Sequence, residues 1–420
     1  MRVSKTKSIQ KLLRVNQHKK ISLGLSRTKK ALGYISWSKK TKSKIVTIGG
    51  TSAKFSIINI FKKILIKNKN SFAATYSPHI KSIVERMEVN SKFIGLNQLK
   101  KILNKIYKMP VRLTEFEMLC VAFAYYIKNK KIQYTLGEMG LFGRKDAIRA
   151  LFPTPDIHVI SPISFDHLHW LKNKKRNLKT LKEIVYEKTS FLKAKRIYIA
   201  KQDSDSLKFI KYYLKNKKCF YYGRDFWLKK KKGKYFYQDR KQSFIINSNL
   251  LGDFMYENAV LAIKIAIDEG ISLSIIKKSL KNITMPGRMQ EIKSGKLRKG
   301  LAKSTLIFCD GAHNSLSSKS ICAALSSKYK NKDLYSIISM ISSKDPSSFL
   351  KPFKSFKKIF FVNMRQDNVY PKEKLNAIAK KFNIPSAVSK NCYEAIKNVP
   401  NKKNAIFLIT GSFYYLQEVI

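Results

Sequence analysis

The sequence predicts an α/β protein of two domains, in which a mostly parallel sheet is followed by a second, smaller α/β domain. Short β-rich runs alternate with helical patterns, which is typical of parallel sheets with crossover helices. A turn with a lysine and several hydroxyl groups follows the first β-rich run, as in phosphate-binding loops. The alternation breaks once, around residues 285–300, and then resumes. We find no internal repeat.

The first α/β series precedes this break. Its predicted helices, at residues 57–66, 115–128 and 256–268, carry apolar residues at helical spacing. Its predicted strands are residues 45–48, 71–75, 132–136, 157–161, 196–200 and 243–246.

The second series follows the break at "MPGR" (285–288) and a basic, turn-like stretch at residues 295–300. Its predicted strands are residues 305–309, 334–340, 358–362 and 405–410. We therefore divide the chain into residues 1–290 and residues 291–420.

Composition excludes several classes of protein. Hydrophobic residues make up 44% of the chain and aromatic residues 12%, which argues against a disordered protein. No uninterrupted apolar run reaches the roughly 18 to 20 residues that a membrane span needs. The N-terminus is basic and lacks the apolar segment of a secretory signal. We therefore expect a cytoplasmic protein with no membrane partner.

The five cysteines are far apart, odd in number and mostly placed inside apolar runs. This pattern predicts reduced, buried thiols and argues against a disulfide framework or a zinc site. They are Cys120, Cys219, Cys309, Cys322 and Cys392.

The formal net charge of +59 has two interpretations. Clustered lysine and arginine would indicate nucleic-acid binding, whereas a compositional bias would cover every solvent face with lysine. Basic residues are spread along the whole chain, and no DNA- or RNA-binding signature accompanies them. We favour the second interpretation and expect no specific nucleic-acid partner.

The stretch "GGTSAKFS" (49–56) lies between the first predicted strand and the first predicted helix. In a phosphate-binding loop, backbone N–H groups and the helix N-terminus hold the anion while a lysine reaches the terminal phosphates. Lys54 stands in place for that role, and Ser56 is placed to bind Mg²⁺ or to cap the helix. Ala53 occupies the position where such loops normally have glycine. An ordinary solvated turn is the alternative.

Two further stretches place polar residues directly after predicted strands, at the edge where α/β sheets bind ligands. "GEMGLFGRKDA" (137–147) brings Glu138, together with a possible charge pair between Arg144 and Asp146. "SPISFDHLHW" (161–170) brings His167 beside Asp166. A carboxylate and an imidazole that end neighbouring strands beside a phosphate loop could share one Mg²⁺ ion. The alternatives are a glycine-bearing surface turn and a structural histidine.

Short motifs along nearly the whole chain occur in one characteristic order. They are "HKKISLGLSRTKKALGYI" (18–35), "TYSPHIKSIVERMEVN" (75–90), "EMGLFGRKDA" (138–147), "SFDHLHWL" (164–171), "LKEIVYEKTSFLK" (181–193), "ENAVLAI" (257–263), "MPGRMQ" (285–290), "DGAHNS" (310–315) and "GSFYYLQEV" (411–419). Together with the phosphate loop, this ordered set resembles the folylpolyglutamate synthase/dihydrofolate synthase family of the Mur ligase superfamily.

The resemblance implies a Mur ligase-like fold, with a P-loop-type ATP-binding domain that carries a folate-binding loop and a Rossmann-like glutamate-ligase domain. It also implies an ATP-dependent ligase. MgATP would phosphorylate a carboxylate of a pterin-bearing substrate, and the amine of L-glutamate would attack the acyl phosphate to form an amide. Dihydropteroate and folate are both implied as substrates, and we expect a monomer.

The resemblance also assigns residues. ATP binding falls to Gly50, Thr51, Ser52, Ala53, Lys54, Ser56, Asn258, Arg288 and Asp310. The implied Mg²⁺ ligands are Ser77, Glu138 and His167, with Ser56 as a further candidate. The implied catalytic residues are Lys54, Lys188, Asp310 and His313, of which Lys188 matches a lysine that is carbamylated in such enzymes. The implied substrate-binding residues are Ser77, Pro78, His79, Arg86, Arg144 and Asp146.

The chain departs from the family pattern at several positions. Ala53, Phe55 and Phe142 stand where the family has glycine, and alanine at a positive φ costs about 1 kcal/mol or more. Phe55 is also expected to crowd the phosphates. A degenerate, noncatalytic relative that binds nucleotide or folate is therefore one alternative, and a Mur-type ligase acting on cell-wall precursors is another. A nucleic-acid-binding protein is the third.

Overall fold

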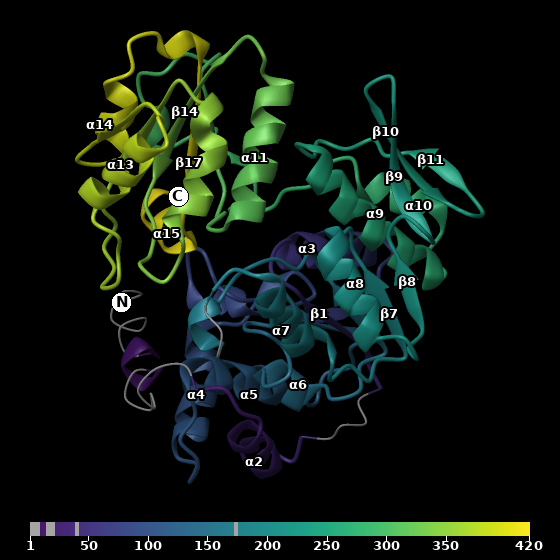
Figure 1. Ribbon diagram of the computed structural model, residues 1–420. Coiled ribbons are helices and arrows are strands. Elements are labelled where there is room, and N and C mark those ends of the chain that lie inside the picture. The colour runs from purple at the N-terminus through teal and green to yellow at the C-terminus, as the bar shows by residue number, and fades with distance from the viewer. Residues whose placement is uncertain (1–8, 14–21, 38–41, 172–174) are drawn as a thin grey trace. The chain divides into compact units, whose positions relative to one another are not determined.

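The computed structural model describes residues 9–13, 22–37, 42–171 and 175–420, and the chain forms two compact units (Figure 1). Residues 18–21, which begin the first of the family motifs, lie outside the described residues. The first unit comprises Met1–Ser164, Lys175–Ser248 and Glu257–Lys281. The second comprises Phe165–Lys174, Asn249–Tyr256 and Asn282–Ile420.

The first unit is built on an eight-stranded sheet with the strand order β4-β3-β2-β5-β1-β6-β7-β8. Its strands are β1 (Lys44–Gly49), β2 (Phe72–Thr75), β3 (Met87–Val89), β4 (Lys92–Phe93), β5 (Tyr134–Glu138), β6 (Ile157–Ile160), β7 (Arg196–Ile199) and β8 (Cys219–Tyr221). All pairs from β2 to β8 are parallel, while β3 and β4 extend the sheet antiparallel. The predicted mostly parallel sheet is therefore confirmed.

Helices lie on both sides of this sheet, with α4, α5 and α6 together on one side and α3 on the other (Figure 1). The helices of the unit are α2 (Ser26–Tyr34), α3 (Lys54–Lys67), η1 (Ile83–Arg86), α4 (Leu96–Tyr107), α5 (Glu115–Ile127), α6 (Ala147–Leu151), α7 (Leu178–Thr189), α8 (Ser204–Tyr213), the greater part of α9 (Asp253–Asp268), and α10 (Leu273–Ser279). Side-chain caps mark where several of them begin. At α5, for example, Thr114 and Glu117 cap each other's backbone amides reciprocally.

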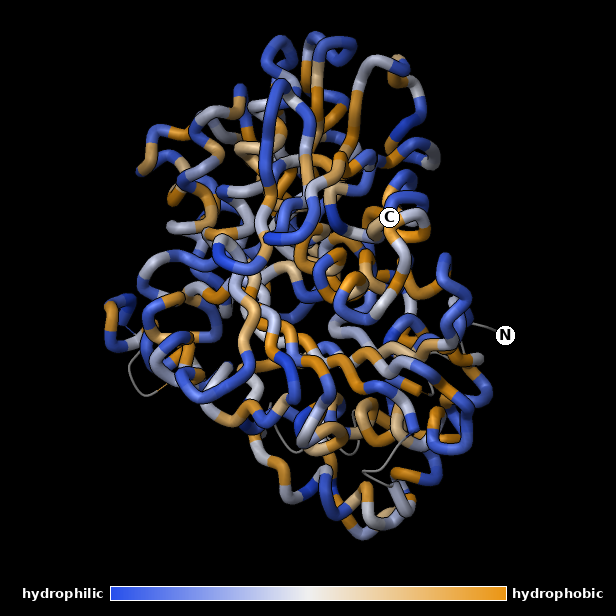
Figure 2. Tube along the Cα trace, turned by 90° about the vertical axis from the view of Figure 1, so that its right-hand side faces the viewer, coloured by the Kyte–Doolittle hydropathy of each residue, from blue (hydrophilic) through white to orange (hydrophobic). Residues whose placement is uncertain are grey.

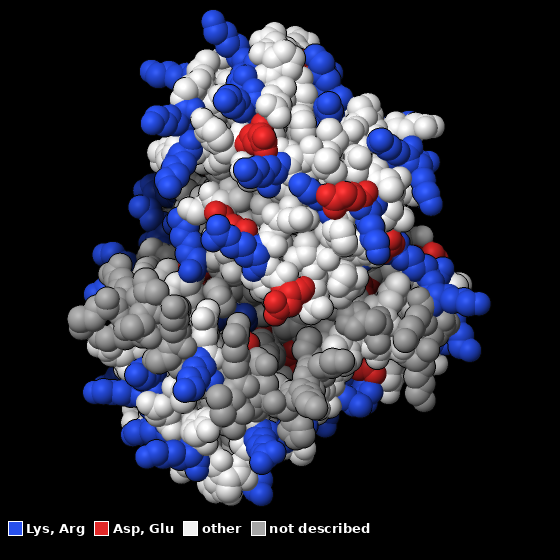
Figure 3. Space-filling model, turned by 90° about the vertical axis from the view of Figure 1, so that its left-hand side faces the viewer, with Lys and Arg blue, Asp and Glu red and all other residues white. Residues whose placement is uncertain are grey.

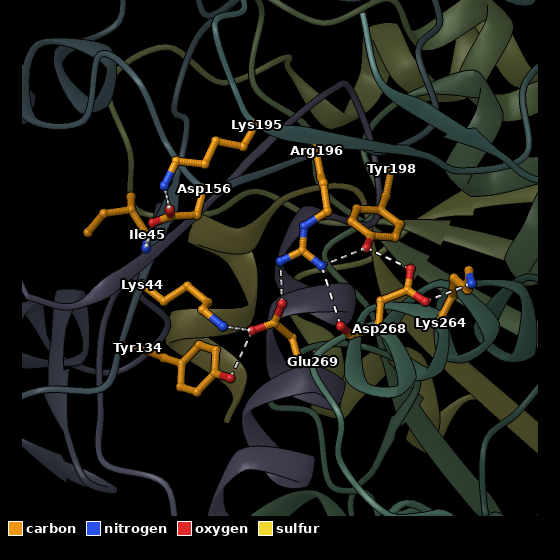
Figure 4. A network of polar contacts seen from close by, with 10 residues as sticks. All are labelled: Lys44, Ile45, Tyr134, Asp156, Lys195, Arg196, Tyr198, Lys264, Asp268 and Glu269. Carbon is orange, nitrogen blue, oxygen red and sulfur yellow. Dashed lines mark hydrogen bonds and ion pairs between the residues drawn. The ribbon is translucent and has the colours of Figure 1, made fainter.

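A network of polar side chains around Glu269 joins the amino ends of three strands to the chain that follows α9 (Figure 4). The side chain of Glu269 is 1% exposed and accepts hydrogen bonds from Lys44 Nζ (2.5 Å), Tyr134 Oη (2.9 Å) and Arg196. Burial alone would raise the pKa of the Glu269 carboxyl, but these three hydrogen bonds hold it below its ordinary value. Because Lys44, Tyr134 and Arg196 begin β1, β5 and β7, the network stabilises the edge of the sheet opposite the carboxyl ends.

A separate antiparallel sheet of three strands follows β8. It consists of β9 (Phe226–Lys231), β10 (Lys234–Asp239) and β11 (Ser243–Ile245), in the order β11-β10-β9. The strand predicted at residues 243–246 thus exists, but it is not part of the parallel sheet.

The second unit contains a six-stranded sheet with the order β12-β13-β17-β14-β15-β16. Its strands are β12 (Gln290–Glu291), β13 (Leu306–Cys309), β14 (Asp333–Ile338), β15 (Lys358–Phe361), β16 (Ser386–Val388) and β17 (Ala405–Thr410). All pairs except β12–β13 are parallel, and the four strands predicted for this part of the chain are all present.

Helices and short turns complete the second unit. They are η2 (Leu168–Trp170), η3 (Lys296–Arg298), α11 (Ser315–Lys328), α12 (Pro346–Leu350), η4 (Lys351–Ser355), α13 (Lys372–Lys381), α14 (Cys392–Lys397), η5 (Lys402–Asn404) and α15 (Phe413–Val419). Apolar side chains of α11, α12, η4 and α13 form one core with those of β13, β14, β15 and β17. In Figure 2 hydrophobic and hydrophilic stretches alternate along the trace.

The surface charges, the cysteines and the helices agree with what the composition predicts. On the face shown in Figure 3, lysine and arginine side chains are scattered and do not gather in one patch. All five cysteines are free and four are buried, as predicted. Within the described ranges, none of the helices has the length and apolar character needed to cross a membrane.

Candidate active site

The carboxyl ends of four adjacent parallel strands, β2, β5, β1 and β6, lie along one edge of the first unit's sheet. In this register Ile48 is opposite Glu138, Gly49 is opposite Ile160, and Thr75 is opposite Gly137. The phosphate-loop candidate follows β1, Ser77 follows β2, and Glu138 ends β5. Three of the predicted site stretches therefore meet at one edge of the sheet, where α/β proteins bind ligands.

The loop after β1 adopts backbone conformations that favour glycine. Gly50 has φ +131°, and a Cβ there would lie 2.1 Å from Ser161 Oγ. Ala53 caps α3 from the left-handed region (φ +67°), the strain expected from the sequence. Thr51 N and Ser52 N donate to the Pro162 carbonyl at 2.9 and 3.2 Å, which ties the loop to the chain after β6.

Two lysines converge on the carbonyl of Gly50. Lys54, the first residue of α3, donates through Nζ to Gly50 O (3.3 Å) and Thr51 O (3.2 Å). Lys188, buried near the end of α7, donates to the same Gly50 oxygen at 2.9 Å. Its Nζ also lies 5.6 Å from the centre of the Phe142 ring. The structure thus brings two predicted catalytic lysines to one point of the loop.

The two residues after Lys54 face different surroundings. Ser56 is 2% exposed within α3. Phe55 packs edge-on against Tyr76, with ring centroids 5.4 Å apart.

The predicted metal ligands Ser77 and Glu138 are in direct contact. Glu138 is buried, and its Oε2 accepts a hydrogen bond from Ser77 N at 3.2 Å. Ser77 precedes Pro78 through a cis peptide bond. A hydroxyl and a carboxylate oxygen form a donor set that suits Mg²⁺.

Arg86, at the end of η1, links the residues predicted to bind substrate. It donates through Nη1 to Ser77 Oγ (3.1 Å) and through Nε to His79 Nδ1 (3.0 Å). Burial, with a smaller effect of the Arg86 charge, lowers the pKa of His79 to about 4. His79 is therefore neutral near pH 7, as its acceptor role requires.

In the loop after β5, Arg144 and Asp146 do not form the expected ion pair. Arg144 instead pairs with Glu187 at 2.7 Å. Asp146 is buried and accepts backbone N–H bonds from Gly140, Leu141 and Ile148, each at 2.9 Å. Burial raises the pKa of Asp146 to about 6, although these backbone bonds and the charge of Lys54 act against it. The prediction of a charge pair was wrong because the Asp146 carboxylate instead accepts hydrogen bonds from the backbone of its own loop.

His167 belongs to the second unit and lies in a cluster of charged side chains. Asp166 accepts hydrogen bonds from Lys344 Nζ and from His167 N, both at 2.8 Å, and its other oxygen lies 3.5 Å from His167 Nε2. Burial alone would raise the pKa of Asp166, but His167 and Lys344 hold it below its ordinary value. The expectation that Glu138 and His167 end neighbouring strands was wrong, because β1 lies between β5 and β6.

The remaining predicted residues divide between the units. Asn258 is buried in the part of α9 that belongs to the first unit. Asp310 in the second unit is buried and accepts hydrogen bonds from Met289 N and Ala312 N, both at 2.8 Å. Burial raises the pKa of Asp310. Burial, with the charge of Lys344, lowers the pKa of His313 to about 3, so this imidazole is neutral.

Sequence reasoning missed several residues of these clusters. His158 on β6 is fully buried beneath the loop, and its Nδ1 lies 2.8 Å from Thr47 Oγ1. A Cβ at Gly49 would lie 3.3 Å from His158 Nε2. A histidine inside an apolar strand was the available signal, whereas nothing in the sequence links Lys344 to Asp166. Over the described parts of the chain, no group of three or more His, Cys, Asp or Glu residues could hold a metal ion by itself.

Comparisons with known proteins agree with this arrangement. A family model of the Mur ligase middle domain matches residues 48–266, slightly more than half of the chain. A curated dihydrofolate synthase/folylpolyglutamate synthase of Bacillus subtilis (strain 168) is 24% identical over 439 residues, covering 94% of this chain and 94% of that protein.

Solved structures also match nearly the whole of this chain. Folylpolyglutamate synthase of Mycobacterium tuberculosis, complexed with ADP, superposes with a TM-score of 0.85 at 19% identity and covers 99% of this chain and 98% of its own. A bifunctional folylpolyglutamate synthase/dihydrofolate synthase from Yersinia pestis, complexed with AMPPNP and a Mn ion, gives 0.81 at 18% identity, covering 99% and 97%. At these identities the structural likeness establishes the fold.

Proposed function

This chain belongs to the Mur ligase family, and on that premise we propose that it is an ATP-dependent ligase that adds L-glutamate to dihydropteroate, to folate polyglutamates, or to both. The observation that carries this proposal is the match to a dihydrofolate synthase/folylpolyglutamate synthase over 94% of both chains. The phosphate-loop candidate with its lysine, at the edge where α/β sheets bind ligands, agrees with it.

The reaction has two steps. The γ-phosphoryl group of ATP passes to a substrate carboxylate, which gives an acyl phosphate and ADP. The amine of glutamate then attacks the acyl carbon, forms the amide and releases phosphate. Side chains do little covalent work in such a transfer, so charge stabilisation and positioning carry the catalysis.

We assign the unit-one residues to ATP and the pterin substrate. Gly50, Thr51, Ser52 and Ala53 offer the loop backbone, Lys54 neutralises the transferring phosphate, and Asn258 contacts the nucleotide. Residues Ser77, Pro78, His79, Arg86, Arg144 and Asp146 form or support the pterin site, with Arg86 already joined to Ser77 and His79.

In the second unit we assign Arg288, Asp310 and His313 to ATP and glutamate. In the proposed division of labour, residues 1–290, which include Arg288, bind ATP and folate, and residues 291–420, which include Asp310 and His313, carry out glutamate ligation. Five free cysteines suit a reducing compartment, so we propose a cytoplasmic enzyme, working as a monomer.

A divalent metal ion accompanies ATP in this proposal, as AMPPNP is accompanied by Mn in the Yersinia pestis relative. Ser77 offers a hydroxyl oxygen and Glu138 a carboxylate oxygen, while the backbone N–H of Ser77 donates to Glu138 Oε2. His167 and Ser56 are the further candidates. When bound, Mg²⁺ supplies positive charge to the phosphate oxygens. Ser77 and Glu138 hold their own positions through the bond between them.

Lys188 is the proposed site of carbamylation. The Lys188 ammonium would first lose a proton to give the neutral amine. The amine nitrogen would then bond to the carbon of CO₂ and lose a second proton, which gives a negatively charged carbamate. The carbamate would keep one hydrogen on Nζ, the atom that now donates to Gly50 O. A carbamate signal in ¹³C NMR after addition of labelled bicarbonate, absent in Lys188→Arg, tests this assignment.

A noncatalytic relative that binds nucleotide or folate remains the second candidate. Two non-glycine residues at positive φ, Ala53 (+67°) and Phe142 (+57°), favour it because they strain loops next to the two lysines. This candidate predicts ATP binding without phosphate release.

One assay separates the candidates. Purified protein with Mg²⁺, ATP and glutamate should release ADP with dihydropteroate or with tetrahydrofolate, and the product should gain the mass of one glutamate. ATP binding without ADP release in either mixture would instead support the noncatalytic relative. ADP release only with cell-wall precursors would identify a Mur-type ligase of another specificity.

A further inference from the structure

The motif "GSFYYLQEV" (411–419) has no role in the function described so far. It follows β17 directly, where Gly411 N donates to the Ala312 carbonyl at 3.0 Å. Ser412 caps α15 by accepting from Tyr414 N at 3.1 Å. The first residue of the helix is Phe413, whose side chain is almost completely buried. The ring of Phe413 is therefore held in a fixed place beside the "DGAHNS" loop.

Three proposed site residues or their neighbours surround this ring, and all belong to the second unit. The guanidinium carbon of Arg288 lies 4.2 Å from the ring centre. The imidazole of His313 meets the ring edge-on, with centroids 6.4 Å apart at 63°. A Cβ at Gly311 would lie 2.4 Å from the nearest ring carbon, so the ring packs directly on the backbone there.

Backbone hydrogen bonds already join the same three segments. Asp310 accepts from Met289 N and Ala312 N, and Gly311 N donates to Gly287 O at 2.9 Å. These bonds fix where the backbone of Arg288 runs, but they do not fix the direction of its long side chain. The aromatic ring constrains that direction, because a guanidinium stacks on a ring face through dispersion and cation–π attraction. The charge of Asp310 acts on the same guanidinium.

We propose that Phe413 is a positioning residue that holds the Arg288 guanidinium, and through Gly311 the loop that carries His313, in place for the nucleotide. This inference rests on the proposed function, which assigns Arg288 and His313 to ATP and glutamate. A guanidinium held against a ring loses less side-chain freedom when it meets a phosphate, and this preorganisation favours tight binding.

The test compares three variants. Phe413→Leu keeps an apolar side chain but removes the ring, and Phe413→Tyr keeps the ring. Phe361→Leu removes a fully buried ring from strand β15 of the same unit. Phe413→Leu should raise the KM and the Kd for ATP about 3- to 10-fold. Phe413→Tyr should stay within about 2-fold of the natural protein. Phe361→Leu should lower Tm without changing either constant.

A second measurement does not depend on activity. The ring current of Phe413 should shift the side-chain NMR resonance of Arg288, identified by its loss in Arg288→Lys, and Phe413→Leu should remove that shift while Phe413→Tyr keeps it. An unshifted Arg288 resonance in the natural protein overturns the proposal. So does a Phe413→Leu protein that loses Tm as Phe361→Leu does but binds ATP normally.

These outcomes separate the two proposals. If the natural protein neither binds ATP nor releases ADP, the proposed function fails and no nucleotide is there to be positioned. If it does both, and Phe413→Tyr is as impaired as Phe413→Leu, only the positioning role fails.

Discussion

The carboxylate of Glu138 lies at the end of β5, is buried, and accepts the amide hydrogen of Ser77. Glu138→Gln keeps the volume of the side chain and an acceptor oxygen, but it removes the negative charge that a Mg²⁺ ligand needs. We expect the variant to fold and to lose ligation. Thermal unfolding followed by circular dichroism checks the fold, and ADP release checks the reaction.

Glu373→Gln is the matched control, because Glu373 is an exposed residue in the first turn of α13. It should leave ADP release unchanged. Activity within a few-fold of normal in Glu138→Gln would show that Glu138 is not the metal ligand.

The imidazole of His158 links a single residue to the pH dependence of stability. Burial lowers its pKa from 6.5 to about 3. Between these two pH values the imidazole is protonated in the unfolded chain and neutral in the folded chain. Its contribution to the free energy of unfolding is therefore complete above pH 6.5 and falls as the pH drops towards 3. The expected slope in that window is about 1.4 kcal/mol per pH unit.

His158→Gln should remove this slope. Chemical unfolding of both proteins between pH 4 and pH 7 measures it, and the advantage of the natural protein should shrink steadily towards acid. Parallel stability curves would mean that His158 titrates alike in the folded and unfolded chains.

Single residues also mark the limit of prediction from sequence. Motif order placed Lys54 and Ser77 after the correct strands and Glu138 at the correct strand's end, because a polar residue that follows a β-rich run is visible locally. The contact of Lys188 with Gly50 joins residues 138 positions apart, and that spacing follows from packing alone. The same holds for the bond between Lys344 and Asp166.

At the scale of elements, the junction of β1 and α3 combines a strained cap with a phosphate-binding arrangement. Ala53 has φ +67°, where an L-residue costs about 1 to 2 kcal/mol and glycine does not. Ala53→Gly should therefore raise the free energy of unfolding by about 0.5 to 1 kcal/mol, after the entropy of the more flexible unfolded chain is deducted. Urea unfolding measures this difference.

Ala377→Gly provides the comparison, since Ala377 is exposed in the interior of α13. Glycine there should lower the free energy of unfolding by about 1 kcal/mol. A loss of similar size at Ala53 would contradict the assignment of strain to the cap.

The same junction yields a prediction about ligand binding. Glycine at both position 53 and position 55 should strengthen ATP binding, because it frees the loop backbone and removes the Phe55 ring. Lys54→Met should abolish turnover, since Lys54 is the loop's own cation. Isothermal titration with ATP and the ADP assay check the two variants, and an unchanged result in both would make this an ordinary turn.

Which elements were predictable depended on their periodicity. The central strands of both sheets are short runs rich in apolar and aromatic residues, so their positions were predicted to within about two residues. The strand β9 was missed because its second half is the lysine run that begins at Lys229, which looks like a solvated loop. Its pairing with β10 is antiparallel and leaves those lysines exposed, which is why the run is compatible with a strand.

For the whole molecule, the charge of +59 predicts a physical property and not a biological partner. Scattered lysines attract any polyanion through counterion release, without reading its sequence. We expect weak binding to DNA or RNA that disappears as salt is raised to the physiological range. Fluorescence anisotropy with two unrelated oligonucleotides at several salt concentrations measures it. Nanomolar, sequence-selective binding at physiological salt would instead identify a true nucleic-acid partner.

The lysine-rich composition affects which residues should be mutated first to find the functional positions of this molecule. The chain holds 85 basic residues but only 26 acidic ones, and many of the acidic side chains are buried where charge is costly. The acidic residues with less than a tenth of the whole residue's surface exposed are Glu88, Glu117, Glu138, Asp146, Asp166, Asp239 and Asp310, and the side chain of Glu269 is buried as well. Because lysine is abundant through compositional bias, a lysine at a given position says little about a role for that position. A carboxylate is scarce in this chain, so its presence indicates a structural or functional role more strongly. A mutational scan that changes each carboxylate to its amide would therefore test proposed ligands and residues that hold loops in place, in a few dozen variants. A lysine scan would need about three times as many variants and would test mainly solvent-exposed side chains.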